Sequence, residues 1–436
     1  MTRLVGTVGL CLAFFSAPAV LAETLNESIA ADYDARLGDL FTYFHAHPEL
    51  SGVEFETARR MAEELRGLGY EVTEGVGGTG VVAVMENGAG PTVMLRADMD
   101  GLPLQEDTGL PYASTVRQQK PDGKEFPVMH ACGHDVHITS MVGTAHQMAQ
   151  RKDQWSGTLV LVVQPAEETI SGAAAMLRDG LYQRFPKPEY ALAFHVDADS
   201  EAGKINVPLH AVASSSDSVD IIVHGVGAHG AYPQQGIDPV LVAAQIVVSL
   251  QSIVSRSISP MEPGVITVGA IHGGTKHNII GDRVEMQLTV RSDSFETRKK
   301  LLAGIKRVAE GVAISLGVPE NLMPEVIFSS TETTPPTLND EATARLIKTT
   351  LETHFGPGTV VENARTGMGA EDFAYFVDPE LGVKGVYFDV GGTPADEVGT
   401  AASHHSPFFK IQPEPAIKAG VEAMVISAMA LMPPSE

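Results

Sequence analysis

The feature that most constrains the fold is an alternation of short apolar runs with helical stretches, between about residues 72 and 196. The stretches between the runs include Ile138–Gln150, whose apolar spacing predicts a helix. The apolar runs are Val81–Met85, Thr92–Leu95, Thr158–Val163 and Tyr190–Phe194. Continuous apolar strands that alternate with helices are typical of a mostly parallel sheet covered by helices. The sequence therefore predicts an α/β domain of that kind.

A second unit with a different pattern follows, at about residues 213–334. Its predicted elements come in the order βαββαβ, which is a ferredoxin-like α+β arrangement. They are the strand Ser218–His224, the helix Asp238–Ser257, the strands Gly264–Ile271 and Arg283–Arg291, the helix Phe295–Leu316 and the strand Glu325–Ser330. Helix and strand patterns resume at Glu341–Phe355 and Val383–Val390. We therefore predict a small domain, 213–334, inserted between two parts of a larger one, 23–212 and 335–436.

The first 22 residues indicate an export signal. Arg3 precedes the apolar run Leu4–Phe15, and Val20-Leu21-Ala22 suits signal-peptidase cleavage after Ala22. A membrane anchor is the alternative, but the run is shorter than the roughly 20 residues that a span requires. We expect no other stretch to be long and apolar enough to cross a bilayer. The protein is therefore predicted to be exported, either to a periplasm or to the medium.

Composition excludes some partners. The chain has 30 Lys and Arg against 54 Asp and Glu, a net charge of −24, which would repel nucleic acid and anionic lipid. Its two cysteines cannot form a disulfide-dense scaffold. Cleavage after Ala22 would remove Cys11 and leave Cys132 alone in an oxidising compartment. Cys132 is then either a buried apolar residue or a thiol protected by something such as a metal ion.

Metal-ligating residue types follow the predicted strands. Thr158–Val163 leads to Glu167 and Glu168, and Tyr190–Phe194 leads to His195. The carboxyl ends of parallel strands are where α/β proteins bind ligands. Further such groups occur in Arg96–Asp100, Met129–His137 and Ser403–Pro407. Thiolate, imidazole and carboxylate together are selected by a borderline divalent cation such as zinc or manganese.

The pair Glu167-Glu168 suits metal-assisted hydrolysis. Adjacent side chains point in different directions, so one carboxylate can bind metal while the other accepts a proton from water. Each group also has a structural alternative: Cys132 as buried filler, His195 as a core residue, and the glutamates as solvated surface. The coincidence of four separate segments favours the metal site over these alternatives.

Two glycine motifs do not predict a nucleotide site. Gly75–Gly80 and Gly225–Gly230 both match G-x-G-x-x-G. The first leads into a strand and the second into Tyr232-Pro233, so neither provides the helix N-terminus that would hold a pyrophosphate.

The motifs, taken in order, resemble the M20 metallopeptidases. The closest similarity is to the amidohydrolase branch, which includes hippurate hydrolases and indole-acetyl-amino-acid hydrolases. The matching segments are His45–Leu50, Leu95–Pro103, Met129–His137, Gln164–Glu168, Phe194-His195, Gly369–Phe373 and His405-Ser406-Pro407. The resemblance implies a zinc-peptidase-like catalytic domain with an inserted lid domain that forms a homodimer.

The resemblance also implies roles for individual residues. Two divalent ions per chain (manganese, zinc, cobalt or nickel) would be bridged by Cys132. The other ligands would be His134, Glu168, His195 and His405. Glu167 would be the general base and then the acid. On the lid, His229 would stabilise the oxyanion, and Asn278 and Arg291 would hold the substrate, with the Arg291 guanidinium suited to a carboxylate.

Some of these assignments have alternatives. His404 competes with His405, which is favoured because it directly precedes Ser-Pro. His229 alone could be a turn residue, and Arg291 a strand-end charge. Gln234 stands where the family commonly has His, and the segment Thr115–Phe126, longer than usual, could shape the pocket rim. His45, His47, His130 and His137 are left as packing or supporting groups.

The predicted function is a metal-dependent amidohydrolase that cleaves the amide of an N-acyl amino acid or small peptide. It would bind no nucleic acid and, after signal cleavage, no membrane. One alternative is a dipeptidase or carboxypeptidase acting on unblocked peptides. The other is a non-catalytic homologue that binds metal.

Overall fold

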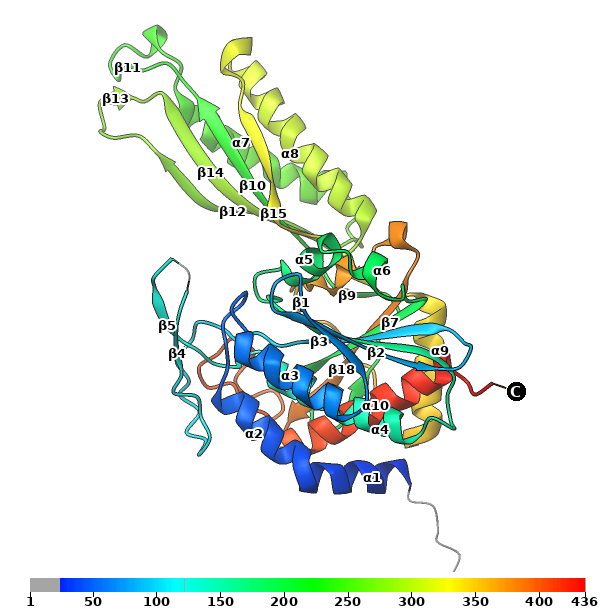
Figure 1. Cartoon of the computed structure of the whole chain (residues 1–436). Coiled ribbons are helices and arrows are strands. Elements are labelled where there is room, and N and C mark those ends of the chain that lie inside the picture. The colour runs from blue at the N-terminus through cyan, green and yellow to red at the C-terminus, as the bar shows by residue number, and fades with distance from the viewer. Residues whose placement is uncertain (1–23, 121, 436) are drawn as a thin grey trace, which may run out of the picture.

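The chain forms two domains, a larger α/β domain and a smaller one that projects from it (Figure 1). The computed structural model describes residues 24–120 and 122–435. The predicted export signal therefore lies outside the described residues.

A mixed sheet of eight strands forms the centre of the larger domain, in the order β1-β2-β6-β3-β7-β18-β8-β17. Neighbours from β6 through β3 and β7 to β18 pair in parallel, as do β8 and β17, and the other pairs are antiparallel. The strands are β1 (Glu71–Val76), β2 (Gly80–Asn87), β3 (Thr92–Asp98), β6 (Gly157–Gln164), β7 (Tyr190–Glu201), β8 (Ile205–Asn206), β17 (Val360–Val361) and β18 (Lys384–Thr393). The four predicted apolar runs lie in β2, β3, β6 and β7, and the predicted α/β class is confirmed.

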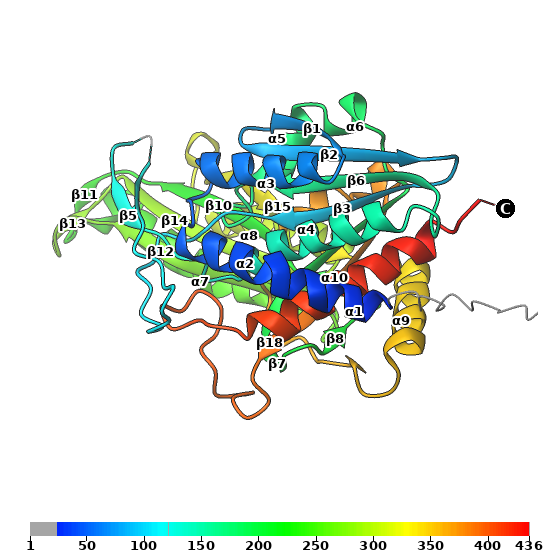
Figure 2. The same cartoon turned by 60° about the horizontal axis from the view of Figure 1, so that its bottom comes forward.

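Helices cover both faces of this sheet (Figures 1 and 2). One face packs against α1 (Leu25–Asp32), α2 (Gly38–Ala46), α3 (Phe55–Gly67), α4 (His134–Gln150), α9 (Glu341–Phe355) and α10 (Pro413–Leu431). The other packs against α5 (Gly172–Arg178), α6 (Leu181–Arg184) and the 3-10 turn η5 (Asp372–Tyr375). In β2, Val81 and Ala83 belong to the first core and Val82 to the second. Burial on both faces explains why the strands read as continuous apolar runs.

The smaller domain has an antiparallel sheet in the order β12-β14-β10-β15, with two helices against one face. Its elements are β10 (Ser215–His224), α7 (Pro239–Ser252), β12 (Gly264–Gly273), β14 (Arg283–Ser292), α8 (Phe295–Ser315) and β15 (Glu325–Thr334). The short pair β11 (Ala228–His229) and β13 (Ile279–Ile280) lies at its far end (Figure 1). The ferredoxin-like arrangement is confirmed, whereas the limits 23–212, 213–334 and 335–436 stay predictions.

Helix α7 is the most apolar helix of the smaller domain. The Asp238 side chain caps it by accepting hydrogen bonds from the backbone N–H groups of Val240 and Leu241. With the following π-helical turn η3 (Ile253–Ser257), it is long and apolar enough to cross a membrane by length and composition. The expectation that no such stretch follows the N-terminal run is therefore wrong on that criterion. The cause is that apolar residues occupy both a buried face and an exposed face, where Leu241 and Val248 lie.

Candidate active site

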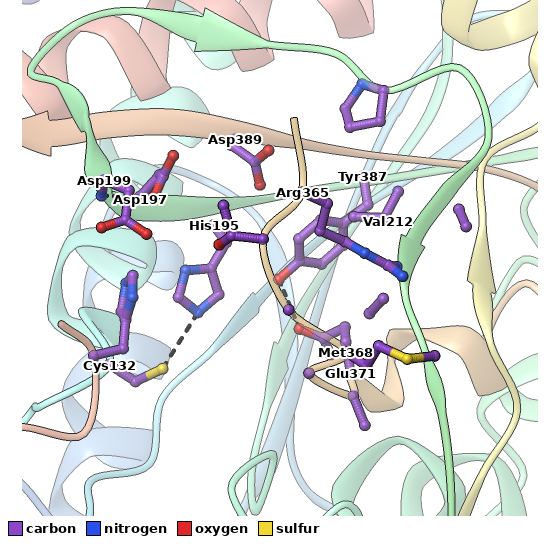
Figure 3. A pocket seen from close by; sticks show the side chains of 18 of the residues that line it. Cys132, His195, Asp197, Asp199, Val212, Arg365, Met368, Glu371, Tyr387 and Asp389 are labelled. Atoms are coloured by element: carbon purple, nitrogen blue, oxygen red, sulfur yellow. Dashed lines mark hydrogen bonds between the residues drawn. The ribbon is translucent and has the colours of Figure 1, made fainter. Parts of the chain in front are cut away.

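The turn before α4 brings Cys132 and His134 to the end of the sheet. Gly133 caps the helix with a φ of 84°, and a Cβ at this position would lie 2.2 Å from Cγ1 of Val196. Only glycine fits both conditions. Cys132 Sγ lies 3.4 Å from Nε2 of His195 on β7 (Figure 3). His134 is fully buried, and its Nδ1 lies 2.8 Å from the Asp100 carbonyl oxygen.

Glu167 and Glu168 are held by the carboxylate of Asp100. The backbone N–H of Glu167 donates to Asp100 Oδ1 at 3.1 Å, and that of Glu168 donates to Oδ2 at 3.0 Å. The flanking residues Ala166 and Ile170 have φ values of 51° and 53°. Left-handed backbone in residues other than glycine is strained, and strain of this kind concentrates at functional sites.

His405, like Ala166 and Ile170, has left-handed backbone although it is not a glycine. Among the described residues, only Ala166, Ile170 and His405 combine a side chain with a positive φ, which is 62° at His405. His405 Nε2 lies 3.3 Å from Glu168 Oε2. The competing His404 instead lies with Nε2 2.9 Å from the Val196 carbonyl oxygen. The geometry therefore brings His405, and not His404, to the glutamate pair.

Cys132 belongs to two groups of possible metal ligands. The first group contains Cys132 Sγ and nitrogens of His134 and His195. The second contains Cys132 Sγ, an oxygen of Glu168 and a nitrogen of His405. Within each group the ligand atoms lie within 4.8 Å of one another. All five predicted ligands are thus brought together. The cavity of about 980 Å³ beside them is lined by Cys132, Glu167, Glu168, His195 and His405, among others.

The residues fit divalent cations. Nε2 of His134 and Oε1 of Glu168 are buried with no hydrogen-bond partner in the described part of the chain, and such orphaned atoms are rare. Burial, followed by the Glu168 and Glu167 carboxylates, raises the pKa of the Cys132 thiol well above its usual range. These effects outweigh the lowering of the thiol pKa that the nearby N-terminus of α4 would cause. A bound cation would reverse this by stabilising the thiolate.

Glu167 lies in a cluster of carboxylates. Carboxylate oxygens of Glu167, Glu371 and Asp372 lie within 4.8 Å of one another. Glu167 Oε2 also lies 3.9 Å from His134 Nε2. Burial, followed by the charges of Glu371 and Glu168, raises the pKa of Glu167 well above its usual range. A carboxylate with raised proton affinity is suited to accept and return a proton.

Supporting residues surround these groups, and one of them is His137, which was predicted only as a packing or supporting group. His137 Nδ1 lies 2.6 Å from Asp98 Oδ1, and its Nε2 accepts from the Val196 N–H at 2.9 Å. The charges of Arg96 and His134 outweigh burial and hold the pKa of Asp98 well below its usual range. The signals for Asp98 were its place after the predicted strand Thr92–Leu95 and within the matching segment Leu95–Pro103.

The three residues predicted on the smaller domain are not all at the cavity. Arg291, on β14, lines it. His229 and Asn278 do not: they lie beside each other, where the Gly230 N–H donates to the Asn278 carbonyl oxygen at 2.8 Å. The described residues of the segment Thr115–Phe126, which carries the hairpin strands β4 (Arg117–Gln119) and β5 (Glu125–Pro127), also do not line the cavity.

The fold and the site define a two-domain metal-dependent hydrolase. The sequence model of peptidase family M20/M25/M40 matches residues 94–430, and the chain belongs to this family. It is 37% identical to the hippurate hydrolase of Campylobacter jejuni over 335 residues, which cover 77% of this chain and 83% of the relative. It is 35% identical to thermostable carboxypeptidase 1 of Saccharolobus solfataricus over 390 residues, which cover 88% of this chain and 92% of the relative.

Solved structures agree. The YXEP protein of Bacillus subtilis, described as a dinuclear metal binding peptidase of the M20 family, superposes with a TM-score of 0.74 at 29% identity. The match covers 91% of this chain and 98% of that one. The predicted family is confirmed, and the protein is a hydrolase of C–N bonds in acyl amino acids or peptides.

Proposed function

We propose that this protein hydrolyses the amide bond of N-acyl amino acids, with two divalent ions bound between Cys132 and its neighbours. The observation that carries the proposal is the place of Cys132 Sγ in both donor groups, while the Glu167 carboxylate stands beside them. The other proposed ligands are His134, Glu168, His195 and His405.

The chain's own residues would divide the reaction between them. Bound ions would polarise the amide carbonyl and lower the pKa of a water molecule. Glu167 would accept the proton of that water and deliver it to the amide nitrogen, so that the free amino acid leaves. Arg291 would bind the carboxylate of the amino acid, because a guanidinium pairs well with a carboxylate.

His229 and Asn278 require a second copy of the chain in this proposal. Both lie away from the cavity, whereas α7 exposes the apolar side chains of Val240, Leu241 and Val248, at 48%, 57% and 67%. We propose a homodimer through the smaller domain, in which each copy supplies His229 and Asn278 to the other. Leu241→Asp with Val248→Asp should give a folded monomer with little activity in light scattering and turnover assays. A fully active monomer would contradict it.

The test of the activity uses metal-free protein loaded separately with zinc, manganese, cobalt or nickel. Release of amino acid from N-acetyl- and N-benzoyl-amino acids, dependent on the ion, is expected. Absence of hydrolysis with every ion would refute the proposal.

A carboxypeptidase or dipeptidase activity is the second candidate. It is favoured by the similarity to thermostable carboxypeptidase 1, which spans 88% of this chain. Faster hydrolysis of unblocked dipeptides than of the N-acetylated amino acids would decide for it.

Export is proposed from the first 22 residues. Mass spectrometry of the protein recovered from fractionated source cells should find a chain that begins at Glu23 outside the cytoplasm. A full-length chain confined to the cytoplasm would contradict it.

A further inference from the structure

One wall of the active-site cavity carries carboxylates that the proposed reaction does not use. Asp389 on β18 pairs in register with His195 on the parallel strand β7. Paired residues of neighbouring strands face the same side of a sheet, and Asp197 shares that side because it lies two residues after His195. Asp389 and Asp197 both line the cavity that contains Cys132.

These carboxylates have few partners of their own. Asn206 Nδ2 donates to Asp389 Oδ2 at 2.9 Å, and Asp197 Oδ1 accepts from the Asp199 backbone N–H at 2.8 Å. In the part of the chain that the structure describes, neither carboxylate forms an ion pair with Lys, Arg or His. Both carboxylates are half-buried, and a negative group that is partly withdrawn from water pairs favourably with a ligand that carries a positive charge.

The cavity therefore offers charges of both signs to a ligand. Arg291 lines it from the smaller domain, and Asp197 and Asp389 line it from β7 and β18. Figure 3 shows Asp197 and Asp199 on one side of His195 and Arg365 and Met368 on the other, with Asp389 above His195. Asp293 Oδ2 already accepts from Arg365, so Arg365 does not neutralise this wall.

We propose that Asp389, assisted by Asp197, selects substrates that carry an ammonium or guanidinium group in addition to the carboxylate assigned to Arg291. This inference rests on the proposed amide hydrolysis and names its substrate class. The positive group is either on the side chain of the released amino acid or on the acyl part. Asp389 is a specificity residue, since neither the ions nor the proton transfer requires it.

Two matched substrate pairs test the idea, each differing in one positive charge. The first pair tests a charge on the amino acid and consists of Nα-acetyl-lysine and its neutral counterpart Nα-acetyl-norleucine. The second tests a charge on the acyl part and consists of N-(4-aminobutanoyl)-leucine and its neutral counterpart N-pentanoyl-leucine. We expect the metal-loaded enzyme to show kcat/KM about tenfold or more higher for the charged member of one pair, the size of one charged hydrogen bond. The pair that shows the preference identifies the side.

Asp389→Asn removes the charge and keeps an oxygen that can accept from Asn206. It should reduce the preference to about twofold or less and leave kcat/KM of the neutral substrates nearly unchanged. Asp197→Asn should reduce the preference in part. It takes the place of Asp389→Asn in the test if that variant folds poorly. Asp220→Asn, an exposed residue of β10, is the matched control and should leave the preference unaltered.

Binding separates this inference from the proposed function. Calorimetry of the same four compounds with metal-loaded Glu167→Gln protein measures the preference without turnover. Tighter binding of a charged member, lost in Glu167→Gln with Asp389→Asn, supports the charge selection even if no amide is cleaved. Equal binding and equal kcat/KM within both pairs, unaltered by Asp389→Asn, would overturn it while the hydrolysis of neutral acyl amino acids stands.

Discussion

Arg96 Nη2 donates to Glu371 Oε1 at 2.8 Å, across 275 residues of sequence. The same guanidinium donates to Asp98 Oδ2 at 2.6 Å and to Gln164 Oε1 at 2.8 Å. Tyr387 donates its hydroxyl to the other oxygen of Glu371 at 2.6 Å. Arg96 thus joins the ends of β3 and β6 to the segment beside Glu167, and it is 1% exposed.

Replacement of Arg96 should be strongly destabilising. Arg96→Met leaves buried carboxylates without their cation, which costs about 3–5 kcal/mol in unfolding free energy. Arg96→Lys should also be destabilising, because an ammonium cannot reproduce the fork of the guanidinium. Urea unfolding of the two variants checks this, and wild-type stability in Arg96→Met would contradict it.

Stability should fall in alkaline solution because of His45. Burial lowers the pKa of His45, but hydrogen bonds to Asp135 and Glu106 outweigh it and raise the pKa to about 9. A raised pKa in the folded state stabilises the protein fully below the unfolded value of about 6.5, and this contribution is lost as the pH rises to about 9. The loss is on the order of 3 kcal/mol. Denaturant unfolding between pH 6 and 10 should show this loss of unfolding free energy in the wild type. An equal loss over the same pH range in His45→Gln would contradict its assignment to His45.

Cys132 should be required for metal binding. Cys132→Ala removes the atom shared by both donor groups, so elemental analysis should find much less metal after dialysis. His404→Ala is the matched control, since His404 contacts the Val196 carbonyl and should leave the metal content near normal. Equal metal content in the two variants would refute the shared role of the thiol.

Gly133 should tolerate no side chain. Gly133→Ala combines a positive φ with a Cβ 2.2 Å from Val196, and we expect a loss of about 2–4 kcal/mol in unfolding free energy. Gly67→Ala, in α3 with no atom within 4 Å of the added carbon, should instead be neutral or slightly stabilising. Thermal unfolding of both variants gives the comparison, and similar Tm values would contradict the account of this turn.

Much of the fold could be predicted because local patterns carry it. The apolar runs of β2 and β6 and the Asp-Pro start of α7 identify their elements without tertiary information. Glu168 and His195 could be placed together because both follow predicted strands, and the resemblance to the M20 family added Cys132 to them as a ligand. The short strands β4 and β5 were not predicted, because three-residue segments carry too little pattern.

Other parts of the site depend on contacts distant in sequence. Nothing near Glu371 indicates that it accepts from Arg96, and nothing near Asp389 indicates that it faces the cavity beside His195. The position of Asp389 follows from the parallel pairing of β7 with β18, and the contact of Glu371 follows from the place of the start of η5 beside β3. Sequence spacing specifies neither. The position of His229 away from the cavity likewise became visible only in the folded domain.

The most direct test of the account compares Glu167→Gln with Glu168→Gln, which alter adjacent residues in the same chemical way. Metal content and hydrolysis of an N-acyl amino acid are measured on both proteins. Glu167→Gln should keep the metal of the wild type and lose about 10²- to 10⁴-fold in kcat, the share of a general base. Glu168→Gln should lose metal together with activity. Near-normal turnover in Glu167→Gln at full metal content would contradict the central claim.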